Sequence, residues 1–143
     1  QLQSGCGWWP GTSLPTGGAD THCVITAHTG LAKAKLFTDL DQLEVGDRFT
    51  LHILDRSMTY EVEQILVTEP EEVDALRIVP GEDLVTLYTC TPYGINSHRL
   101  LVRGRRIGEE RAGDADRSAV RWIVPAVLVG TAAAVLAGRR RRQ

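Results

Sequence analysis

Hydrophobic and polar residues alternate through the middle of the chain, which is the pattern of half-buried β-strands. Phe49, Leu51 and Ile53 alternate with polar residues. The same alternation runs through residues 60–67, where it slips at residues 64–65, as a β-bulge would cause. Further strands are predicted over residues 21–27, 84–90 and 98–103. Several strands joined by loops, with little helix, predict a mostly antiparallel β-barrel or sandwich.

The segments between the predicted strands have different compositions. Residues 1–20 are rich in glycine and proline, which indicates a loop with at most a short strand. Residues 36–43 place hydrophobic side chains at the spacing of one helical face, which predicts a short helix. Residues 68–83 are acidic and contain two prolines, so they are predicted to form a long solvated loop with a short helix.

A hydrophobic segment near the end of the chain predicts a transmembrane helix. Residues 122–138 contain no charged side chain, and at about 1.5 Å per residue they span roughly 25 Å as a helix. The helix is predicted over residues 119–138, with Arg121 reaching out of the hydrocarbon. Residues 139–143 then form a basic tail that the positive-inside rule places in the cytoplasm, with the body of the protein outside the membrane. A buried core helix is the alternative.

Charge is distributed unevenly along the chain. Residues 1–118 contain 18 acidic residues and 11 lysines or arginines, while residues 119–143 contain five arginines and no acid. An acidic body argues against nucleic acid as the main partner, because binding to phosphates needs a basic surface. Residues 108–118 are charged and contain glycine and alanine, which predicts a linker between the body and the membrane segment.

The start of the chain and its three cysteines bear on export and on redox state. The chain begins at Gln1 and shows no hydrophobic signal segment, so we expect that its N-terminus is truncated and a targeting segment lies upstream.

An odd number of cysteines leaves at least one thiol outside any internal disulfide. A Cys6–Cys23 disulfide is chemically allowed outside the cytoplasm, and spacing alone does not establish it. No Cys-x-x-Cys pair occurs, so a structural zinc site has little support.

Cys90, His28 and Arg99 are the candidate catalytic residues. Cys90 ends one predicted strand and Arg99 begins the next, so their side chains are able to face each other near one rim of the barrel. A cysteine attacks a carbonyl group as the thiolate, a histidine serves as general base and then as general acid, and an arginine stabilises the oxyanion. Together these groups make an acyl-transfer site that needs no cofactor.

Each candidate also has an ordinary structural explanation. A cysteine at the end of a strand is often a small buried hydrophobic residue, and a histidine on a loop is usually solvated. Arg99 is able to pair with surface acids for little gain in stability. The other histidines are explained by strand alternation for His22 and His52 and by a loop edge for His98.

The sequence around these candidates resembles the sortases, which are bacterial membrane-tethered cysteine transpeptidases. TLYTC at residues 86–90, with Arg99 nine positions after the cysteine, resembles the TLxTC signature of that family. The matching segments are GTSLPTGG, HCVITAHTGL, AKLFTDLDQLEVGD and TCTPYGINSHRLLVRGRR. They are similar to the class C branch, which assembles pili, and they extend over about residues 11–106.

The resemblance implies a sortase β-barrel whose catalytic domain occupies residues 1–107 without its first strands. It assigns the nucleophile to Cys90, general acid and base catalysis to His28, and stabilisation of the thiolate and oxyanion to Arg99. It implies cleavage of an LPXTG-like sorting signal after threonine and transfer of the acyl group to a lysine amine of a pilin. It implies no cofactor, metal or nucleic acid, and it places the catalytic domain outside a bacterial cell membrane.

Two departures from the family pattern leave alternatives open. The usual TGHRG motif around the histidine is TAHTG at residues 26–30, which retains His28. The N-terminal membrane segment, lid and first strands typical of class C do not precede the GTSLP-like stretch, so the sheet is expected to have an open edge. The alternatives are a catalytically inactive membrane-tethered module that binds sorting signals and a sortase that anchors proteins to the cell wall.

Overall fold

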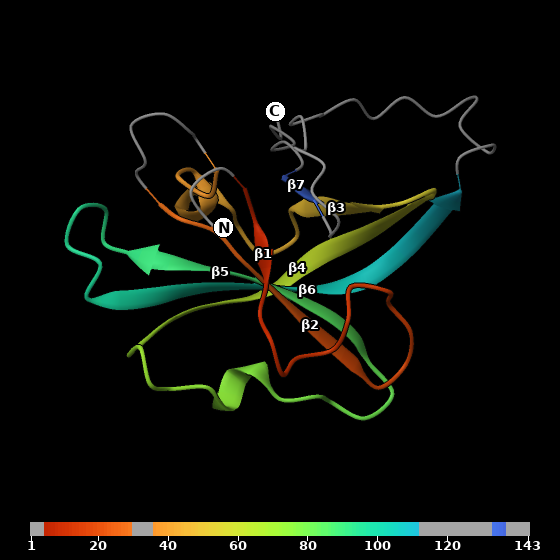
Figure 1. The fold of residues 1–143 in the computed structure, drawn as a ribbon, viewed down its shortest axis with the longest axis horizontal. Helices are drawn as coiled ribbons and strands as arrows, with labels where there is room; N and C mark the ends of the chain where they lie inside the picture. Colours follow the sequence, from red (N-terminus) through yellow and green to blue (C-terminus); the bar gives the residue numbers. More distant parts are fainter. Residues whose placement is uncertain (1–4, 30–35, 112–132, 137–143) are drawn as a thin grey trace.

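A twisted β-sheet forms the framework of the molecule (Figure 1). The computed structural model describes residues 5–29, 36–111 and 133–136 of the 143-residue chain. Within them the strand order is β1-β2-β5-β6-β4-β3-β7, and all neighbouring strands are antiparallel except β2 and β5. The strands are β1 (Gly7–Trp8), β2 (Thr21–Thr26), β3 (Arg48–Ile53), β4 (Arg56–Thr68), β5 (Asp83–Thr91), β6 (His98–Arg111) and β7 (Ala133–Leu136), with 3-10 turns η1 (Leu40–Gln42) and η2 (Asp74–Leu76). The prediction of a mostly β fold is confirmed.

The hydrophobic core fills the concave face of the sheet, because alternate residues of β2 to β6 turn their side chains inward. Phe49 and Tyr60 stack at its centre with their rings 5.6 Å apart. Burial of each large hydrophobic side chain stabilises the fold by about 1.5–3 kcal/mol. The predicted barrel is therefore present, among the described strands, as a curled half-barrel around one core.

Gly104 on β6 allows that strand to pass close to the aromatic pair. A Cβ atom at this position would lie 2.6 Å from Cε1 of Phe49 and 2.9 Å from Cβ of Tyr60. Carbon atoms in contact prefer separations of about 3.5–4.0 Å. The close packing of β6 against Phe49 therefore requires a glycine here.

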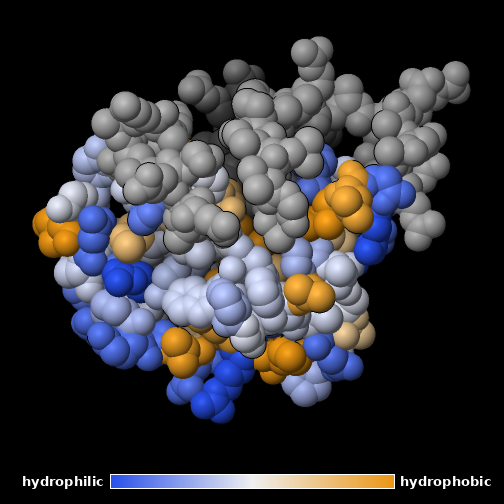
Figure 2. Space-filling model, viewed as in Figure 1, coloured by the Kyte–Doolittle hydropathy of each residue, from blue (hydrophilic) through white to orange (hydrophobic). Residues whose placement is uncertain are grey.

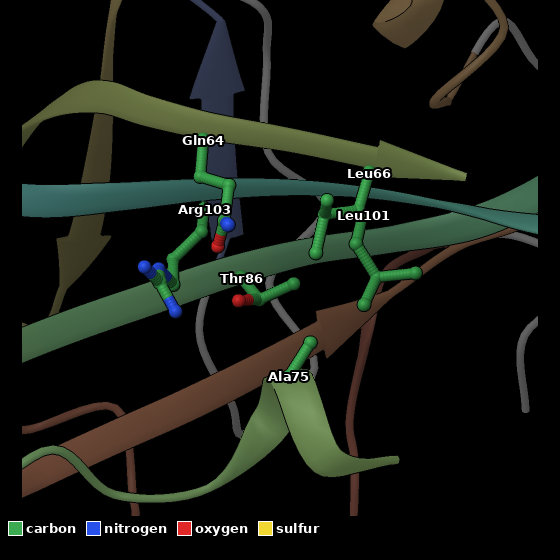
Figure 3. Close-up of a pocket in the computed structure, with 6 residues that line it drawn as sticks. All are labelled: Gln64, Leu66, Ala75, Thr86, Leu101 and Arg103. Carbon is green, nitrogen blue, oxygen red and sulfur yellow. The ribbon is translucent and has the colours of Figure 1, made fainter. Parts of the chain in front are cut away.

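A smaller hydrophobic cluster lies on the convex face, where the β4–β5 loop of residues 69–82 crosses the sheet. Figure 3 shows Leu66 of β4 and Leu101 of β6 on the side of the sheet that faces Ala75 of η2. One side of the loop that the sequence predicts to be solvated is thus partly buried. The cluster contains Val24, Tyr88 and Leu101, with Trp9, Leu66, Ala75 and Leu76 packed against them.

The β4–β6 ladder contains two irregularities. Glu63 is an extra residue in β4 and Ile107 is an extra residue in β6. The bulge at Glu63 reverses the alternation, so Ile65 packs against the core and Leu66 against the convex cluster. The predicted slip at residues 64–65 is therefore real and begins one residue earlier.

β6 is longer than the sequence predicts and includes part of the predicted linker. Residues 108–111 continue β6 and pair with residues 56–59 of β4. Arg56 and Glu109 form an ion pair at 2.5 Å across these strands. The linker prediction is wrong for residues 108–111, because their backbone pairs with β4 and the Glu109 carboxylate forms the ion pair with Arg56. Residues 112–118 lie outside the described part of the chain.

The helix predicted over residues 36–43 is reduced to the 3-10 turn η1. Phe37 and Leu40 are nevertheless buried, with 2% and 0% of their surfaces exposed. The helical spacing of hydrophobic residues thus reflects two side chains that enter the core from a turn. A segment this short does not nucleate a stable α-helix by itself.

Most of the predicted transmembrane helix, residues 119–138, and the basic tail, residues 139–143, lie outside the described residues. The four described residues, Ala133–Leu136, form β7 and pair with β3, where the sequence predicts helix. An unpaired strand edge offers backbone donors and acceptors to an extended segment, which accounts for a strand here. Among the described residues, no helix is long and apolar enough to cross a membrane.

The exposed hydrophobic residues are scattered over the surface. On the face in Figure 2, they form separate patches among polar residues. Tyr93 and Ile95 stand out in the β5–β6 turn, with 67% and 71% of their surfaces exposed. Isolated exposed hydrophobic residues are common in soluble domains.

Candidate active site

Cys90 and Arg99 occupy directly opposed positions on neighbouring strands. Cys90 is the second-last residue of β5, and it pairs in register with Arg99, the second residue of β6. Residues opposed in this way have Cα atoms about 4.5–5.5 Å apart and side chains on the same face. The sequence predicted that these two side chains are able to face each other, and the strand register places them as neighbours on the convex face.

His28 reaches the same level from the other side of β5. β2 runs parallel to β5 with Thr26 beside Tyr88, so the same register continued by two residues brings His28 beside Cys90. The Ala27 N–H donates to the Tyr88 carbonyl at 3.3 Å, which extends the ladder past the end of β2. The imidazole of His28 is exposed to solvent.

Thr89 fixes the chain segment that carries His28. Its hydroxyl donates to the Ala27 carbonyl at 2.7 Å and also hydrogen-bonds to the Thr29 hydroxyl. Both contacts lie on the concave side, because Thr89 alternates with Cys90 along β5. His28 is thus held between two anchored residues, and the alternation of β2, continued past its end, assigns the His28 side chain to the convex side.

Arg99 is held at the start of β6 by backbone carbonyl groups. Its Nη1 donates to the carbonyl oxygens of Asn96 at 3.0 Å and His98 at 2.9 Å. The side chain is partly buried. Among the described residues, no carboxylate forms an ion pair with this guanidinium, so its positive charge is available to a thiolate or an oxyanion.

Thr68 and Tyr88 are two further residues at this site that sequence reasoning missed. Thr68 of β4 pairs in register with Arg99, and its hydroxyl is buried without a hydrogen-bond partner among the described residues. Tyr88 lies two residues before Cys90, so it shares the convex face. Alternation along the strand could have found Tyr88, because residues two apart on a strand point the same way. Thr68 could not be found, because its position depends on the β-bulges.

His22 anchors the β4–β5 loop over the convex face. Its Nδ1 donates to the Arg77 carbonyl at 2.8 Å, and its Nε2 accepts from the Thr86 hydroxyl at 2.7 Å. Burial lowers the pKa of His22, which keeps the ring neutral. Next to this contact, a small hollow between η2 and strands β4 to β6 is lined by Gln64, Leu66, Ala75, Thr86, Leu101 and Arg103 (Figure 3).

The three cysteines differ in environment, and none of them forms a disulfide. The Cys6–Cys23 bond that the sequence left open is therefore not formed. Burial raises the pKa of Cys23 to about 12, so this thiol is a poor nucleophile at neutral pH. Cys6 packs against the core. Of the three cysteines, Cys90 is the one that lies beside Arg99 and beside the segment that carries His28.

The site contains the groups for acyl transfer. A thiol, an imidazole and a guanidinium occupy neighbouring positions on β5, the extension of β2, and β6. Figure 1 shows that the end of β5 and the start of β6 lie next to each other, where these two interior strands end. Among the described residues, no group of three histidine, cysteine, aspartate or glutamate side chains is placed to hold a metal ion.

The chain is similar to sortases in both sequence and fold. A family model described as the sortase domain matches residues 1–107. The fold is similar to that of Streptococcus suis sortase C1, with 56% identity, a TM-score of 0.74, and coverage of 76% of this chain and 60% of that one. It is also similar to Streptococcus pneumoniae sortase C, a structure reported to give insight into catalysis and pilin substrate specificity. The identity is 56%, the TM-score is 0.74, and the match covers 75% of this chain and 56% of that one.

A more distant relative is sortase SrtE1 of Streptomyces coelicolor. It is 32% identical over 81 residues, which are 51% of this chain and 23% of that protein. The chain spans less than two thirds of the length of each of these three relatives.

Proposed function

The chain belongs to the sortase family, because the family model matches most of its length, and we propose that it is the catalytic core of a pilus-assembling cysteine transpeptidase. Its substrates in this proposal are LPXTG-like sorting signals, and its acceptor is a lysine amine of a pilin subunit. The identity of 56% to two sortase C structures supports this class of sortase.

The observation that carries the proposal is the alignment of three strand positions. Cys90 lies between Arg99 on β6 and the segment of His28 beyond β2. The spacing between neighbouring strands, about 4.7–4.9 Å, supports the proposal that all three side chains act on one peptide bond. Cys23, by contrast, is buried among hydrophobic residues of the concave face.

The first half of the proposed reaction forms a thioester. The Cys90 sulfur gives its proton to His28 and attacks the carbonyl carbon of the threonine–glycine bond. Arg99 donates hydrogen bonds to the oxyanion of the tetrahedral intermediate. The carbon–nitrogen bond then breaks, and His28 gives the proton to the leaving glycine amine.

The second half transfers the acyl group to an amine. The neutral lysine amine attacks the thioester carbonyl, and His28 accepts a proton from the nitrogen as the new amide forms. The carbon–sulfur bond breaks, and the sulfur recovers its proton from His28. The product is an isopeptide bond, and the reaction needs no oxidant or reductant.

We further propose that this reaction takes place outside a bacterial membrane to which the chain is anchored. The support is the uncharged stretch of residues 122–138, followed by four consecutive arginines. Residues 108–111 belong to the sheet, so any linker to the anchor begins after them.

The decisive experiment is mass spectrometry of the full-length chain in detergent after incubation with an LPXTG-type peptide. We expect an added mass on Cys90 that corresponds to the peptide cleaved after threonine. Cys90→Ala should abolish this adduct, and Cys6→Ala, which removes a different partly buried thiol, should retain it. An adduct in Cys90→Ala would refute the assignment of the nucleophile.

The same assay separates the proposal from its alternatives. Release of the thioester by a pilin-derived lysine peptide, with little release by a glycine amine, supports pilus assembly. The reverse preference indicates cell-wall anchoring. Binding of the peptide without any adduct indicates an inactive binding module.

A further inference from the structure

Tyr88 lies on the convex face next to both reactive groups of the proposed site. It precedes Cys90 by two residues on β5, and it pairs in register with Leu101 while Cys90 pairs with Arg99. Tyr88 and Arg99 are therefore diagonal neighbours across two strands. Diagonal neighbours lie about 7–8 Å apart, which long and aromatic side chains bridge.

The side chains of Tyr88 and Arg99 interact electrostatically. Burial raises the pKa of the Tyr88 phenol, and the charge of the Arg99 guanidinium and a side-chain hydrogen bond with it oppose that rise, as expected for diagonal neighbours on one face. On its other side, the guanidinium donates to the backbone carbonyls of Asn96 and His98. An arginine side chain loses rotamer entropy when it is fixed in one conformation. Tyr88 and the backbone carbonyls of Asn96 and His98 together restrain Arg99 beside Cys90.

The Tyr88 ring is itself fixed by packing. Only 6% of its surface is exposed. Trp9 packs against it edge to face, with the ring centroids 4.6 Å apart and the ring planes at 85°. Val24 and Leu101 complete its surroundings. The phenol oxygen therefore has a defined position from which to hold Arg99.

A phenol suits this role better than a carboxylate. Burial raises the pKa of Tyr88, against the opposing effect of Arg99, while Cys90 and Glu71 are the nearby groups that raise it further. At neutral pH the hydroxyl is uncharged, so it accepts a hydrogen bond without neutralising Arg99. The full positive charge stays available for the Cys90 thiolate and for the oxyanion.

We propose that Tyr88 is the positioning residue for Arg99, an inference that rests on the transpeptidase function proposed above. Its hydroxyl orients the guanidinium toward Cys90, and the segment that carries Trp9 couples this orientation to the N-terminal part of the fold. In TLYTC, the third residue is then part of the site rather than a spacer between the strand core and the cysteine.

The test is Tyr88→Phe, which keeps the ring packed on Trp9 and removes only the hydroxyl. We expect kcat for thioester formation to fall about tenfold, from loss of one hydrogen bond to a charged group, with KM little changed. The rate at which iodoacetamide alkylates Cys90 is measured against pH by mass spectrometry of the peptide that contains Cys90. The midpoint of this profile should shift to higher pH, because a misplaced guanidinium stabilises the thiolate less. Tyr93→Phe, the same change on an exposed tyrosine, is the control and should alter neither value.

A second comparison shows whether Tyr88 acts through Arg99. In an Arg99→Ala background, Tyr88→Phe should add no further loss, because the group that it positions is absent. A full additional loss there, or normal kcat and an unchanged alkylation profile in Tyr88→Phe alone, would overturn the proposal. If the unmodified chain forms no thioester, the transpeptidase function fails, and the alkylation profile still decides the role of Tyr88.

Discussion

Gly104→Ala provides a direct test of how closely β6 packs against the core. The added Cβ atom would lie 2.6 and 2.7 Å from two carbons of the Phe49 ring and 2.9 Å from Cβ of Tyr60. Phe49 cannot give way easily, because its ring is buried and stacks on Tyr60 with the ring centroids 5.6 Å apart. The methyl group therefore forces either the ring or β6 to move.

The size of the effect follows from two opposing contributions. Overpacking a core by one methyl group costs about 1–3 kcal/mol, and three contacts below 3 Å put this site at the upper end. Replacing glycine by alanine lowers the entropy of the unfolded chain and returns about 0.5–1 kcal/mol. We expect a net loss of about 2 kcal/mol in the free energy of unfolding.

Gly108 on the same strand provides a matched control. A Cβ atom at Gly108 would meet no atom within 4 Å. Urea denaturation, followed by circular dichroism and extrapolated to water, should show Gly108→Ala to be neutral or slightly stabilising. Phe49→Leu, combined with Gly104→Ala, should recover part of the loss because it makes room for the methyl group. Equal effects of the two alanine variants would refute the packing argument.

Three further predictions concern other features of the structure. Thr68→Val should raise the free energy of unfolding by about 1 kcal/mol in urea denaturation, because it removes a buried hydroxyl without a partner; a loss of stability would show that the hydroxyl is satisfied in solution. Leu54→Asn should stabilise the β3–β4 hairpin by about 0.5–1 kcal/mol, because Leu54 has a φ of 54° and is 99% exposed; Leu54→Val should do the opposite, and two variants of equal stability would contradict this. The lowered pKa of His22 predicts that stability falls as the pH drops below about 6.5, because the unfolded chain then binds more protons than the folded one; the urea midpoint of His22→Asn should fall less between pH 7.5 and pH 5.5 than that of the unmodified chain.

Local sequence patterns predict the strands well and their lengths less well. The period of two locates β3 and most of β4, while β5 and the first half of β6 are predicted from runs of hydrophobic and β-branched residues, and β5 is buried on both faces. The second half of β6 carries glycine and charged residues, and only its pairing with residues 56–59 makes it a strand. The hydrophobic spacing over residues 36–43 correctly predicts burial but wrongly predicts a helix, because a 3-10 turn directs the same side chains into the core.

The candidate site divides in a similar way. Cys90 and Arg99 are joined by a short connection, so their proximity follows from the hairpin that the sequence predicts. The position of His28 beside Cys90 depends on the parallel pairing of β2 with β5, which no local pattern specifies. Thr68 joins the site only because the bulge at Glu63 shifts the alternation of β4. Non-local register, in contrast to local pattern, sets most of the geometry of the site.

The parallel pairing of β2 with β5 also determines when the site is assembled during folding. Antiparallel hairpins such as β3–β4, with its two-residue turn, close short loops and form quickly, while β2 must find β5 across about sixty intervening residues. The cysteine and the arginine therefore meet early, and the histidine arrives with the last long-range contact. If His28 is the proton acceptor of Cys90, as proposed, a newly made or partly folded chain carries the thiol without that acceptor, and its reactivity depends on completion of the tertiary structure.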